Sequence, residues 1–127
     1  MSETLTILVV DDDPSMASTL ADILDVKGFE VHAANSGAEA LEILRDHPVN
    51  ILLTDVKMPD MNGVELYWAT RKTYPNLITL LMTAYAADDI IQKGMAEGIK
   101  TVLIKPVDID FLLTLLSTFK KLPTKAG

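Results

Sequence analysis

The sequence has 127 residues, of which 49% are hydrophobic and 23% are charged, as is usual for a single globular domain. It contains no cysteine, which excludes a disulfide framework and a thiolate metal site. Its formal net charge of −7 argues against a nucleic-acid surface, and it shows neither a secretory leader nor an apolar run long enough to cross a membrane. We therefore predict a cytoplasmic protein that binds neither nucleic acid nor membranes.

Short apolar runs alternate with amphipathic segments along the chain. The runs predict buried strands over residues 5–10, 29–34, 49–54, 77–82 and 101–104. The segments that follow them predict helices over residues 14–27, 37–45, 64–73, 87–97 and 109–120. This alternation is typical of a flavodoxin-like (βα)5 fold, a doubly wound parallel five-stranded sheet with strand order 2-1-3-4-5. We expect one domain over residues 1–127, with a core over about 5–120 and a tail over 121–127.

Several predicted helices begin with capping residues. Asp13 precedes Pro14, an arrangement that favours Asp13 as the N-cap and the proline as the first helical residue. Ser36 and Glu39 have the spacing of a capping box. Asp108 is the expected cap of the last helix.

The carboxyl ends of four predicted strands carry residues that bind or transfer charge. They are Asp11 and Asp12 after the first strand, Asp55 after the third, Thr83 after the fourth and Lys105 after the fifth. In a parallel sheet these ends lie along one edge, with neighbouring strands about 5 Å apart. Taken singly, Thr83 is most often a turn hydroxyl and Lys105 a solvated strand end. Their shared edge nevertheless predicts a single site.

Three carboxylates in one site require a cation. Two carboxylates roughly 4 Å apart repel by about 4 kcal/mol at an effective dielectric of about 20, which costs stability or raises a pKa. Oxygen ligands without a nearby His or Cys favour Mg²⁺, with Mn²⁺ as the alternative, and leave positions for water and a phosphate oxygen. The set predicts phosphoryl transfer, with Asp55 as nucleophile and with Lys105 and Thr83 at the phosphoryl oxygens.

Four separated motifs have a recognisable order and spacing. They are Val-Val-Asp-Asp-Asp at residues 9–13, Leu-Thr-Asp-Val-Lys-Met-Pro at 53–59 with Met-Asn-Gly at 61–63, Met-Thr-Ala at 82–84, and Ile-Lys-Pro at 104–106. This set resembles the signature of the receiver domains of two-component response regulators, the chemotaxis regulators among them. The resemblance covers residues 5–120.

The resemblance implies a signalling phosphoacceptor and not an enzyme with a separate substrate. Asp55 would accept a phosphoryl group from the phosphohistidine of a sensor histidine kinase or a phosphotransfer protein, or from a small acyl phosphate. The domain would catalyse its own phosphorylation and dephosphorylation. Asp12, Asp55 and the main-chain carbonyl of Lys57 would bind Mg²⁺ directly, and Asp11 mainly through water.

The resemblance also implies how the phosphoryl group is held and sensed. Thr83, the amide of Ala84 and Lys105 would hold its oxygens, and Lys105–Pro106 would be a cis peptide. Phosphorylation would draw Thr83 inward and switch the surface formed by the fourth helix, the fifth strand and the fifth helix. That surface would bind an output domain or protein, or would form a homodimer.

Some features are particular to this sequence. Receiver domains usually carry Tyr or Phe three residues before the lysine, where this chain has Val102, so we expect switching to depend on the loop after Thr83 and on the fourth helix. Gly94 lies within that helix and costs roughly 1 kcal/mol relative to alanine, which predicts a locally weak helix. The fifth helix has two apolar stripes, which predicts a partner or dimer surface: Leu112, Leu115 and Phe119 in one, and Ile109, Leu113 and Leu116 in the other.

Two functions of other classes are compatible with parts of the sequence. A haloacid-dehalogenase-like phosphatase would explain the aspartates at 11–13, but would leave Asp55 without a role. A flavodoxin-like FMN carrier shares the predicted fold, but would need a Ser/Thr-rich phosphate loop after the first strand. The chain is either a complete regulator or the receiver of a longer protein. We interpret His32 and His47 as surface residues and Trp68 as a core or filler residue.

Overall fold

The computed structural model describes residues 4–85 and 87–121. Each expected strand and helix is present: β1 (Thr6–Val10), α1 (Pro14–Val26), β2 (Glu30–Ala34), α2 (Gly37–Asp46), β3 (Ile51–Asp55), α3 (Gly63–Thr70), β4 (Ile78–Thr83), α4 (Asp89–Glu97), β5 (Thr101–Ile104) and α5 (Ile109–Lys121). Most of the predicted tail, residues 122–127, lies outside the described residues. Within the described part of the chain, no helix is both long enough and apolar enough to span a membrane.

The strands form one parallel sheet in the order β2-β1-β3-β4-β5, which confirms the predicted topology. At the carboxyl edge, Val10 of β1 lies opposite Thr54 of β3, and Thr83 of β4 lies opposite Ile104 of β5. The ends of these four strands therefore lie along one edge of the sheet, as the sequence predicts.

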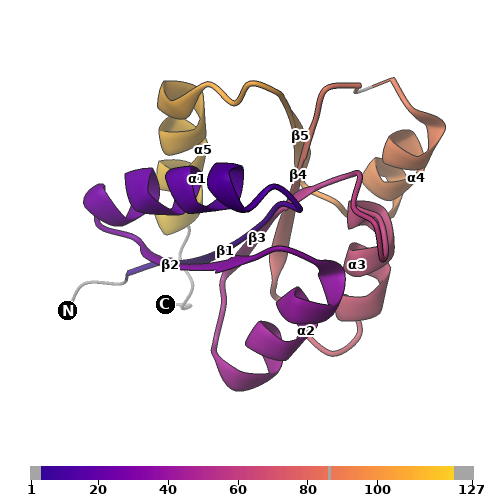
Figure 1. Cartoon of the computed structure of the whole chain (residues 1–127), viewed down its shortest axis with the longest axis horizontal. Helices are drawn as coiled ribbons and strands as arrows, with labels where there is room; N and C mark the ends of the chain where they lie inside the picture. The colour runs from indigo at the N-terminus through magenta and orange to yellow at the C-terminus, as the bar shows by residue number, and fades with distance from the viewer. Residues whose placement is uncertain (1–3, 86, 122–127) are drawn as a thin grey trace.

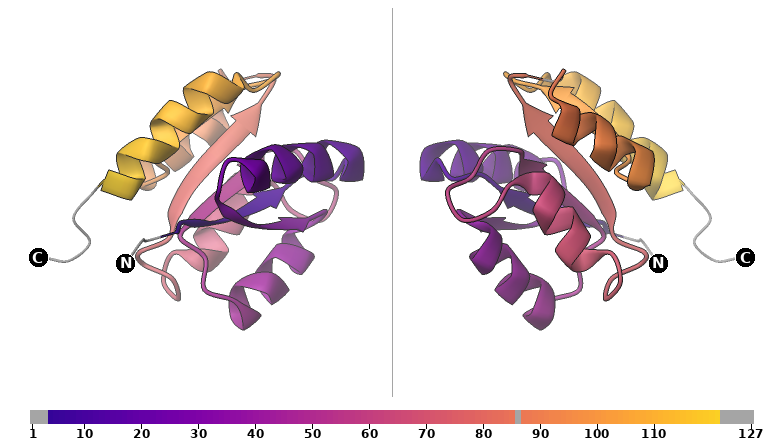
Figure 2. Two further views of the ribbon diagram at one scale, coloured as in Figure 1. Left: turned by 90° about the vertical axis from the view of Figure 1, so that its left-hand side faces the viewer. Right: turned by 90° about the vertical axis from the view of Figure 1, so that its right-hand side faces the viewer.

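Helices cover both faces of the sheet (Figure 1; Figure 2). α1 and α5 pack on one face, over a cluster that includes Val9 and Leu53. α2, α3 and α4 pack on the other face, where Leu8, Leu52 and Leu81 belong to the buried clusters. Successive residues of a strand point to opposite faces, and both faces are covered. This is why β1 and β3 read as continuous apolar runs and not as alternating ones.

The caps predicted for α1 and α5 are present. The Asp13 carboxylate accepts a hydrogen bond of 3.0 Å from the Ser15 N–H, and Pro14 is the first residue of α1. The Asp108 carboxylate accepts a hydrogen bond of 3.1 Å from the Phe111 N–H. Local polar residues thus define where these two helices begin.

The predicted capping box of α2 is only half formed. Ser36 Oγ accepts a hydrogen bond from the Glu39 N–H, at 3.0 Å, but the Glu39 carboxylate accepts from Asn35 and not from Ser36. A complete capping box occurs instead at α3, between Asn62 and Glu65.

Helix α3 ends at Thr70, earlier than the predicted end near residue 73. The Thr70 hydroxyl donates to the Tyr67 carbonyl at 2.9 Å, and the chain continues as a turn that Tyr74 closes by donating its N–H to the Thr70 carbonyl at 2.8 Å. The prediction relied on Pro75 as the stop signal, and this hydroxyl competes for the helix backbone before the proline is reached.

The six apolar residues of the two α5 stripes pack against one core cluster, and the partner or dimer surface expected on this helix stays a prediction. Leu112, Leu116 and Phe119 are buried, and the other three apolar residues of the two stripes pack against the same cluster. Two stripes are used because that cluster contains residues of α1 as well as of the sheet. Within the described part of α5, Phe111 is a large apolar residue that stays exposed, with 55% of its surface accessible to solvent.

Candidate functional site

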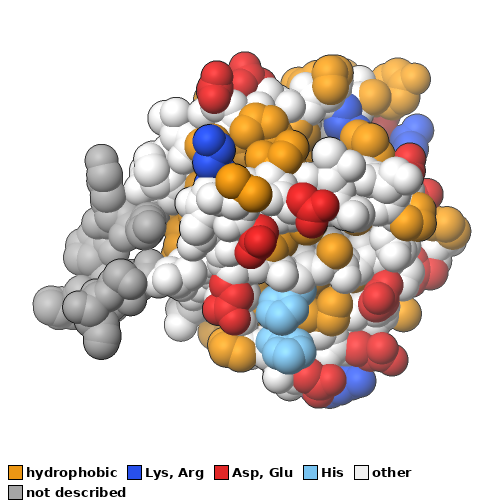
Figure 3. Space-filling view, turned by 60° about the vertical axis from the view of Figure 1, so that its left-hand side comes forward, with side chains coloured by type: hydrophobic (Ala, Val, Ile, Leu, Met, Phe, Trp, Pro, Cys, Tyr) orange, Lys and Arg blue, Asp and Glu red, His pale blue; other side chains and the backbone are white. Residues whose placement is uncertain are grey.

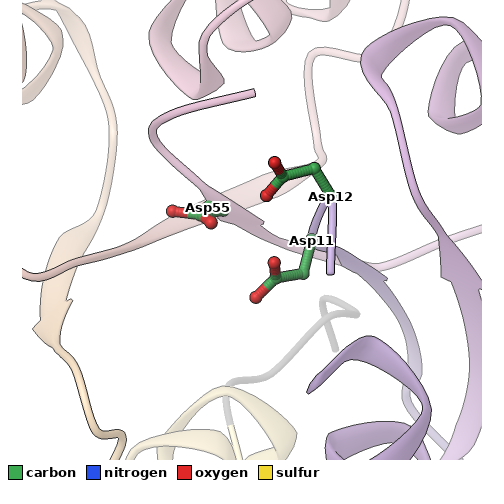
Figure 4. Close-up of side chains that lie close together, drawn as sticks. All are labelled: Asp11, Asp12 and Asp55. Carbon is green, nitrogen blue, oxygen red and sulfur yellow. The ribbon is translucent and has the colours of Figure 1, made fainter. Parts of the chain in front are cut away.

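Three carboxylates gather at the carboxyl ends of β1 and β3. Asp11 and Asp12 directly follow β1, and Asp55 is the last residue of the adjacent strand β3. One oxygen of each carboxylate lies within 4.8 Å of the others. Figure 4 shows the three side chains entering the same space from these two strand ends. Asp11 and Asp55 are buried and Asp12 is exposed, so the cluster is reached from solvent on the Asp12 side.

Lys105 places its ammonium between two of these carboxylates. Its Nζ lies 3.1 Å from Asp11 Oδ2 and 3.0 Å from Asp55 Oδ2. Burial raises the pKa of the Asp55 carboxyl, and the hydrogen bond from Lys105 opposes this shift. Burial lowers the pKa of Lys105, but its bonds to Asp55 and Asp11 outweigh that effect, so the pKa is raised overall. Lys105 is therefore a cation at neutral pH, and it offsets one of the three carboxylates.

The loop after β1 is held by contacts that the sequence does not reveal. Asp11 Oδ1 accepts a hydrogen bond of 3.0 Å from the Asp13 N–H, which turns the chain back over the strand end. Asn35, which follows β2, donates from Nδ2 to the Asp11 carbonyl at 3.1 Å. Asn35 thus supports the acidic loop from the neighbouring strand. No motif pointed to it, because a single Asn after a strand is an ordinary turn residue.

The loop between β3 and α3 closes tightly beside Asp55. The Gly63 N–H donates to the Val56 carbonyl at 2.8 Å. A side chain on Gly63 would bring its Cβ to 2.5 Å from the Asp55 carbonyl oxygen, so this approach requires glycine. Within the loop, the Lys57 backbone N–H lowers the pKa of the Asp55 carboxyl, against the larger effect of burial. The loop therefore holds both the orientation of the acceptor carboxylate and the position of the Lys57 backbone.

Thr83 is buried at the end of β4, where its hydroxyl accepts a hydrogen bond of 3.0 Å from the Tyr85 N–H. Its carbonyl accepts the Lys105 N–H at 2.8 Å, which joins the ends of β4 and β5. Ala84 follows in an exposed position, and the Lys105–Pro106 peptide is cis. Thr83, Ala84 and Lys105 thus meet at the edge that also carries the carboxylates.

The acidic cluster fits a hard divalent cation. Its members are carboxylates with no His or Cys among them, and their ligand atoms are close enough for one ion to contact all three. Mg²⁺ binds oxygen ligands at about 2.1 Å and retains several waters, so a site open on one side suits it. The residues present could therefore hold Mg²⁺ or Mn²⁺.

The histidines and the tryptophan lie away from this cluster. The rings of His32 and His47 stack with their centroids 4.5 Å apart, and Figure 3 shows them side by side on the surface. Trp68 of α3 is only partly buried, and it donates from Nε1 to Glu97 Oε1 of α4 at 2.6 Å. Trp68 packs against a core cluster, as a core or filler residue would, but the sequence did not predict its polar contact with Glu97.

Comparison with known proteins agrees with the fold. The profile of the family described as "Response regulator receiver domain" matches residues 7–117. The chain belongs to this family of two-component signalling domains. A response regulator receiver protein of Anaeromyxobacter sp. (strain Fw109-5) is 41% identical over 108 residues, which are 85% of this chain and 45% of that protein. Membership in this family decides against the phosphatase and the flavin carrier.

Solved receiver structures have the same fold. The CheY-like receiver domain protein of Methanospirillum hungatei JF-1 matches 98% of this chain and 100% of its own, with a TM-score of 0.90 and 30% identity. The response regulator TrrA of Thermotoga maritima, solved in complex with Mg²⁺ and BeF, matches 91% of this chain and 98% of its own, with a TM-score of 0.78 and 26% identity.

The matched curated relatives are longer than this chain. It spans 45% of the Anaeromyxobacter protein, and 26% and 24% of the next two relatives. The single-domain organisation predicted for residues 1–127 stays a prediction.

Proposed function

We propose that Asp55 accepts a phosphoryl group from the phosphohistidine of a sensor histidine kinase or a phosphotransfer protein, in a cytoplasmic, Mg²⁺-dependent step. The observation that carries this proposal is the convergence of Asp11, Asp12, Asp55 and Lys105 in one site. The chain is then a signalling phosphoacceptor, which catalyses its own phosphorylation and dephosphorylation.

Asp55 would act as the nucleophile. One of its oxygens attacks phosphorus, the new P–O bond forms as the P–N bond breaks, and the ring, protonated at its other nitrogen, leaves as neutral imidazole. In dephosphorylation, water attacks the phosphorus of the acyl phosphate. The P–O bond to Asp55 then breaks and inorganic phosphate leaves.

Mg²⁺ would be held by Asp12, Asp55 and the main-chain carbonyl of Lys57, with Asp11 acting mainly through water. When bound, the ion offsets the charge that the carboxylates and the phosphoryl oxygens bring together. TrrA, which has the same fold, was solved with Mg²⁺ and BeF, and this supports the assignment. Mn²⁺ should substitute, because it accepts the same oxygen ligands.

Lys105, Thr83 and the Ala84 amide would hold the transferred phosphoryl group. Lys105 Nζ is already 3.0 Å from Asp55 Oδ2, so its charge is next to the oxygen that would carry phosphorus. The Thr83 hydroxyl, now the acceptor of the Tyr85 N–H, would turn inward and donate to a phosphoryl oxygen. That change would release the Tyr85 amide, and so would alter the loop after β4.

The surface of α4, β5 and α5 would transmit the signal to an output domain or protein, or to a second copy of the chain. Ile104 of β5 and Phe111 of α5 are 53% and 55% exposed and line one shallow hollow there. Val102, in the place of the usual aromatic residue, is half-buried and packs against the cluster beneath α4. We propose that movement of α4 and of the loop before it replaces an aromatic rotamer change.

Intact-mass spectrometry after incubation with acetyl phosphate tests the chemistry. The wild type should gain one phosphoryl group with Mg²⁺ and none without it, and Asp55→Asn should gain none. Asp46→Asn, an exposed aspartate at the end of α2, is the matched control and should be labelled like the wild type. Labelling of Asp55→Asn at the wild-type rate would overturn the assignment of the acceptor.

A further inference from the structure

We infer that Asp60 is a positioning residue, which holds the loop between β3 and α3, residues 56–62, in the conformation that presents Asp55 and the Lys57 backbone to Mg²⁺. The inference rests on the proposed function and adds to it a residue outside the acidic cluster. Asp60 lies on this loop with an exposed side chain, and its carboxylate contacts a different element of the fold.

The carboxylate of Asp60 binds the amino end of α2. Its Oδ1 accepts a hydrogen bond of 3.2 Å from the Gly37 N–H, and its Oδ2 accepts one of 2.9 Å from the Ala38 N–H. The first amides of a helix have no partner within the helix and lie at the positive end of its dipole, so they favour a carboxylate. These hydrogen bonds, that of Ala38 above all, lower the pKa of Asp60, which keeps it ionised at neutral pH.

The same segment also contacts α2 through apolar atoms. A Cβ placed on Gly37 would overlap the side chain of Met61, so the methionine lies directly against the helix backbone. Met61 also packs on the cluster that Leu8 and Leu52 share with α2. The middle of the loop is therefore fixed to α2 at two consecutive residues, one polar and one apolar.

Lys57 lies between this anchor and the closed base of the loop. At the base, the Gly63 N–H donates to the Val56 carbonyl at 2.8 Å, and Lys57 directly follows Val56. Pro59 lies between Lys57 and Asp60, and its ring fixes φ. Few backbone rotations can therefore absorb a displacement of Asp60, and we expect the Lys57 backbone to move with it. Mg²⁺ requires nearly ideal octahedral geometry, and small shifts of an oxygen ligand weaken its binding.

The experiment compares Asp60→Ala with Ser36→Ala. Ser36 caps the same end of α2, but its bond runs to the Glu39 N–H within the helix. Both variants should therefore lose a comparable part of the free energy of unfolding, whereas only Asp60→Ala disturbs the loop. Mn²⁺ affinity is measured from the electron paramagnetic resonance signal of free Mn²⁺. We expect the Mn²⁺ Kd of Asp60→Ala to rise about tenfold, which is the lower end of the loss of metal affinity seen when a group that orients a metal ligand is removed. The Kd of Ser36→Ala should stay within about twofold of the wild-type value.

A second variant and a second readout separate positioning from general damage. Asp60→Asn retains one acceptor oxygen, so its Kd should lie between those of the wild type and Asp60→Ala. The rate of labelling by acetyl phosphate should recover in both variants at saturating Mn²⁺, because the nucleophile is intact. If Asp60→Ala does not fold, the test compares the Mn²⁺ Kd of Asp60→Asn with that of Ser36→Ala.

The outcomes distinguish this inference from the proposed function. A wild type that binds no Mn²⁺ and accepts no phosphoryl group would overturn the proposed function, and the inference with it. A wild type that binds Mn²⁺, with an Asp60 variant whose affinity equals that of Ser36→Ala, would overturn the positioning role alone.

Discussion

Lys105 Nζ and Asp55 Oδ2 lie 3.0 Å apart, although β5 and β3 are separated in the sheet by β4. The lysine also reaches Asp11, at 3.1 Å, so it bridges two buried carboxylates. This geometry gives Lys105 two effects. It reduces the repulsion within the acidic cluster, and it places a positive charge beside the oxygen that would carry the phosphoryl group.

Replacing Asp55 by asparagine should raise the free energy of unfolding by about 1 kcal/mol near neutral pH in the presence of a chelator, because it removes a buried carboxylate charge. Burial raises the pKa of Asp55 above its ordinary value of 3.8, so the folded chain holds the proton more tightly than the unfolded chain does. Ionisation of Asp55 therefore costs stability as the pH rises from 3.8 through the folded pKa.

Urea unfolding of the wild type and Asp55→Asn from about pH 3 to about pH 8 measures this effect. The difference between the two proteins should be small at the acid end, where both states are protonated, and should grow toward neutral pH. A difference independent of pH would contradict the explanation. Mg²⁺ should stabilise the wild type more than the variant, because the variant lacks one carboxylate of the cluster.

Replacing Lys105 by methionine should lower the free energy of unfolding by about 2 kcal/mol without divalent metal, because it leaves Asp11 and Asp55 buried without their cation. The pKa of Lys105 is raised above 10.5, so this stabilisation is complete below 10.5 and is lost only as the pH rises through the folded pKa. Thermal unfolding of Lys105→Met, with the exposed Lys72→Met as control, tests this. Equal melting temperatures of the two variants would contradict it.

Replacing Gly94 by alanine should destabilise the chain by about 1 kcal/mol, although alanine is the better helix former by a similar amount. The new Cβ would lie 2.6 Å from Ile99 Cδ1 and 3.2 Å from Val64 Cγ1, so we expect crowding against Ile99 and against α3 to outweigh helix propensity. Ile99→Val removes the nearer atom. The double variant should therefore lose less stability than the sum of the two single changes, and strict additivity in urea unfolding would contradict the packing argument.

Trp68 and Glu97 should couple by about 1 kcal/mol in a double-mutant cycle of Trp68→Phe and Glu97→Ala. The indole Nε1 donates to Glu97 Oε1 at 2.6 Å, and the same oxygen accepts from Arg71 at 3.3 Å. Circular dichroism in urea is the measurement, since the variant lacks the fluorophore. Glu97→Gln should keep most of the coupling, because the amide oxygen still accepts the indole hydrogen bond. Zero coupling would mean that solvent replaces the contact without loss.

Phosphoryl-mimic binding should move α4 and the loop after β4 more than it moves Val102. The Tyr85 N–H now bonds to the Thr83 hydroxyl at 3.0 Å, and inward rotation of that hydroxyl breaks the bond. At the other end of α4, the Tyr67 hydroxyl donates to the Glu97 carbonyl at 2.7 Å, which favours a pivot about the carboxyl end of the helix. Amide hydrogen exchange with and without beryllofluoride should change most over residues 84–91. Unchanged exchange there would contradict this mechanism.

The sequence by itself determined the order of the elements and most of the residues at the site. Buried parallel strands need apolar residues on both faces, so runs such as that of β1 are visible without a structure. Asp13 and Asp108 cap the helices beside them, which is a local interaction between residues close in the chain. Because parallel strands end at one edge, Asp55 and Lys105 could also be predicted to be neighbours.

Only the tertiary structure decided the contacts between elements distant in the sequence. The bonds of Asn35 to the Asp11 carbonyl, of Asp60 to α2 and of Trp68 to Glu97 depend on how helices and loops pack, and a single polar residue carries no sign of its partner. The apolar residues of α5 show the same limit, because their pattern does not reveal that both stripes pack against one cluster shared by α1 and the sheet and that Phe111 is left exposed. Local propensity and periodicity act over one turn or one strand, whereas these contacts are set by the free energy of packing the whole domain.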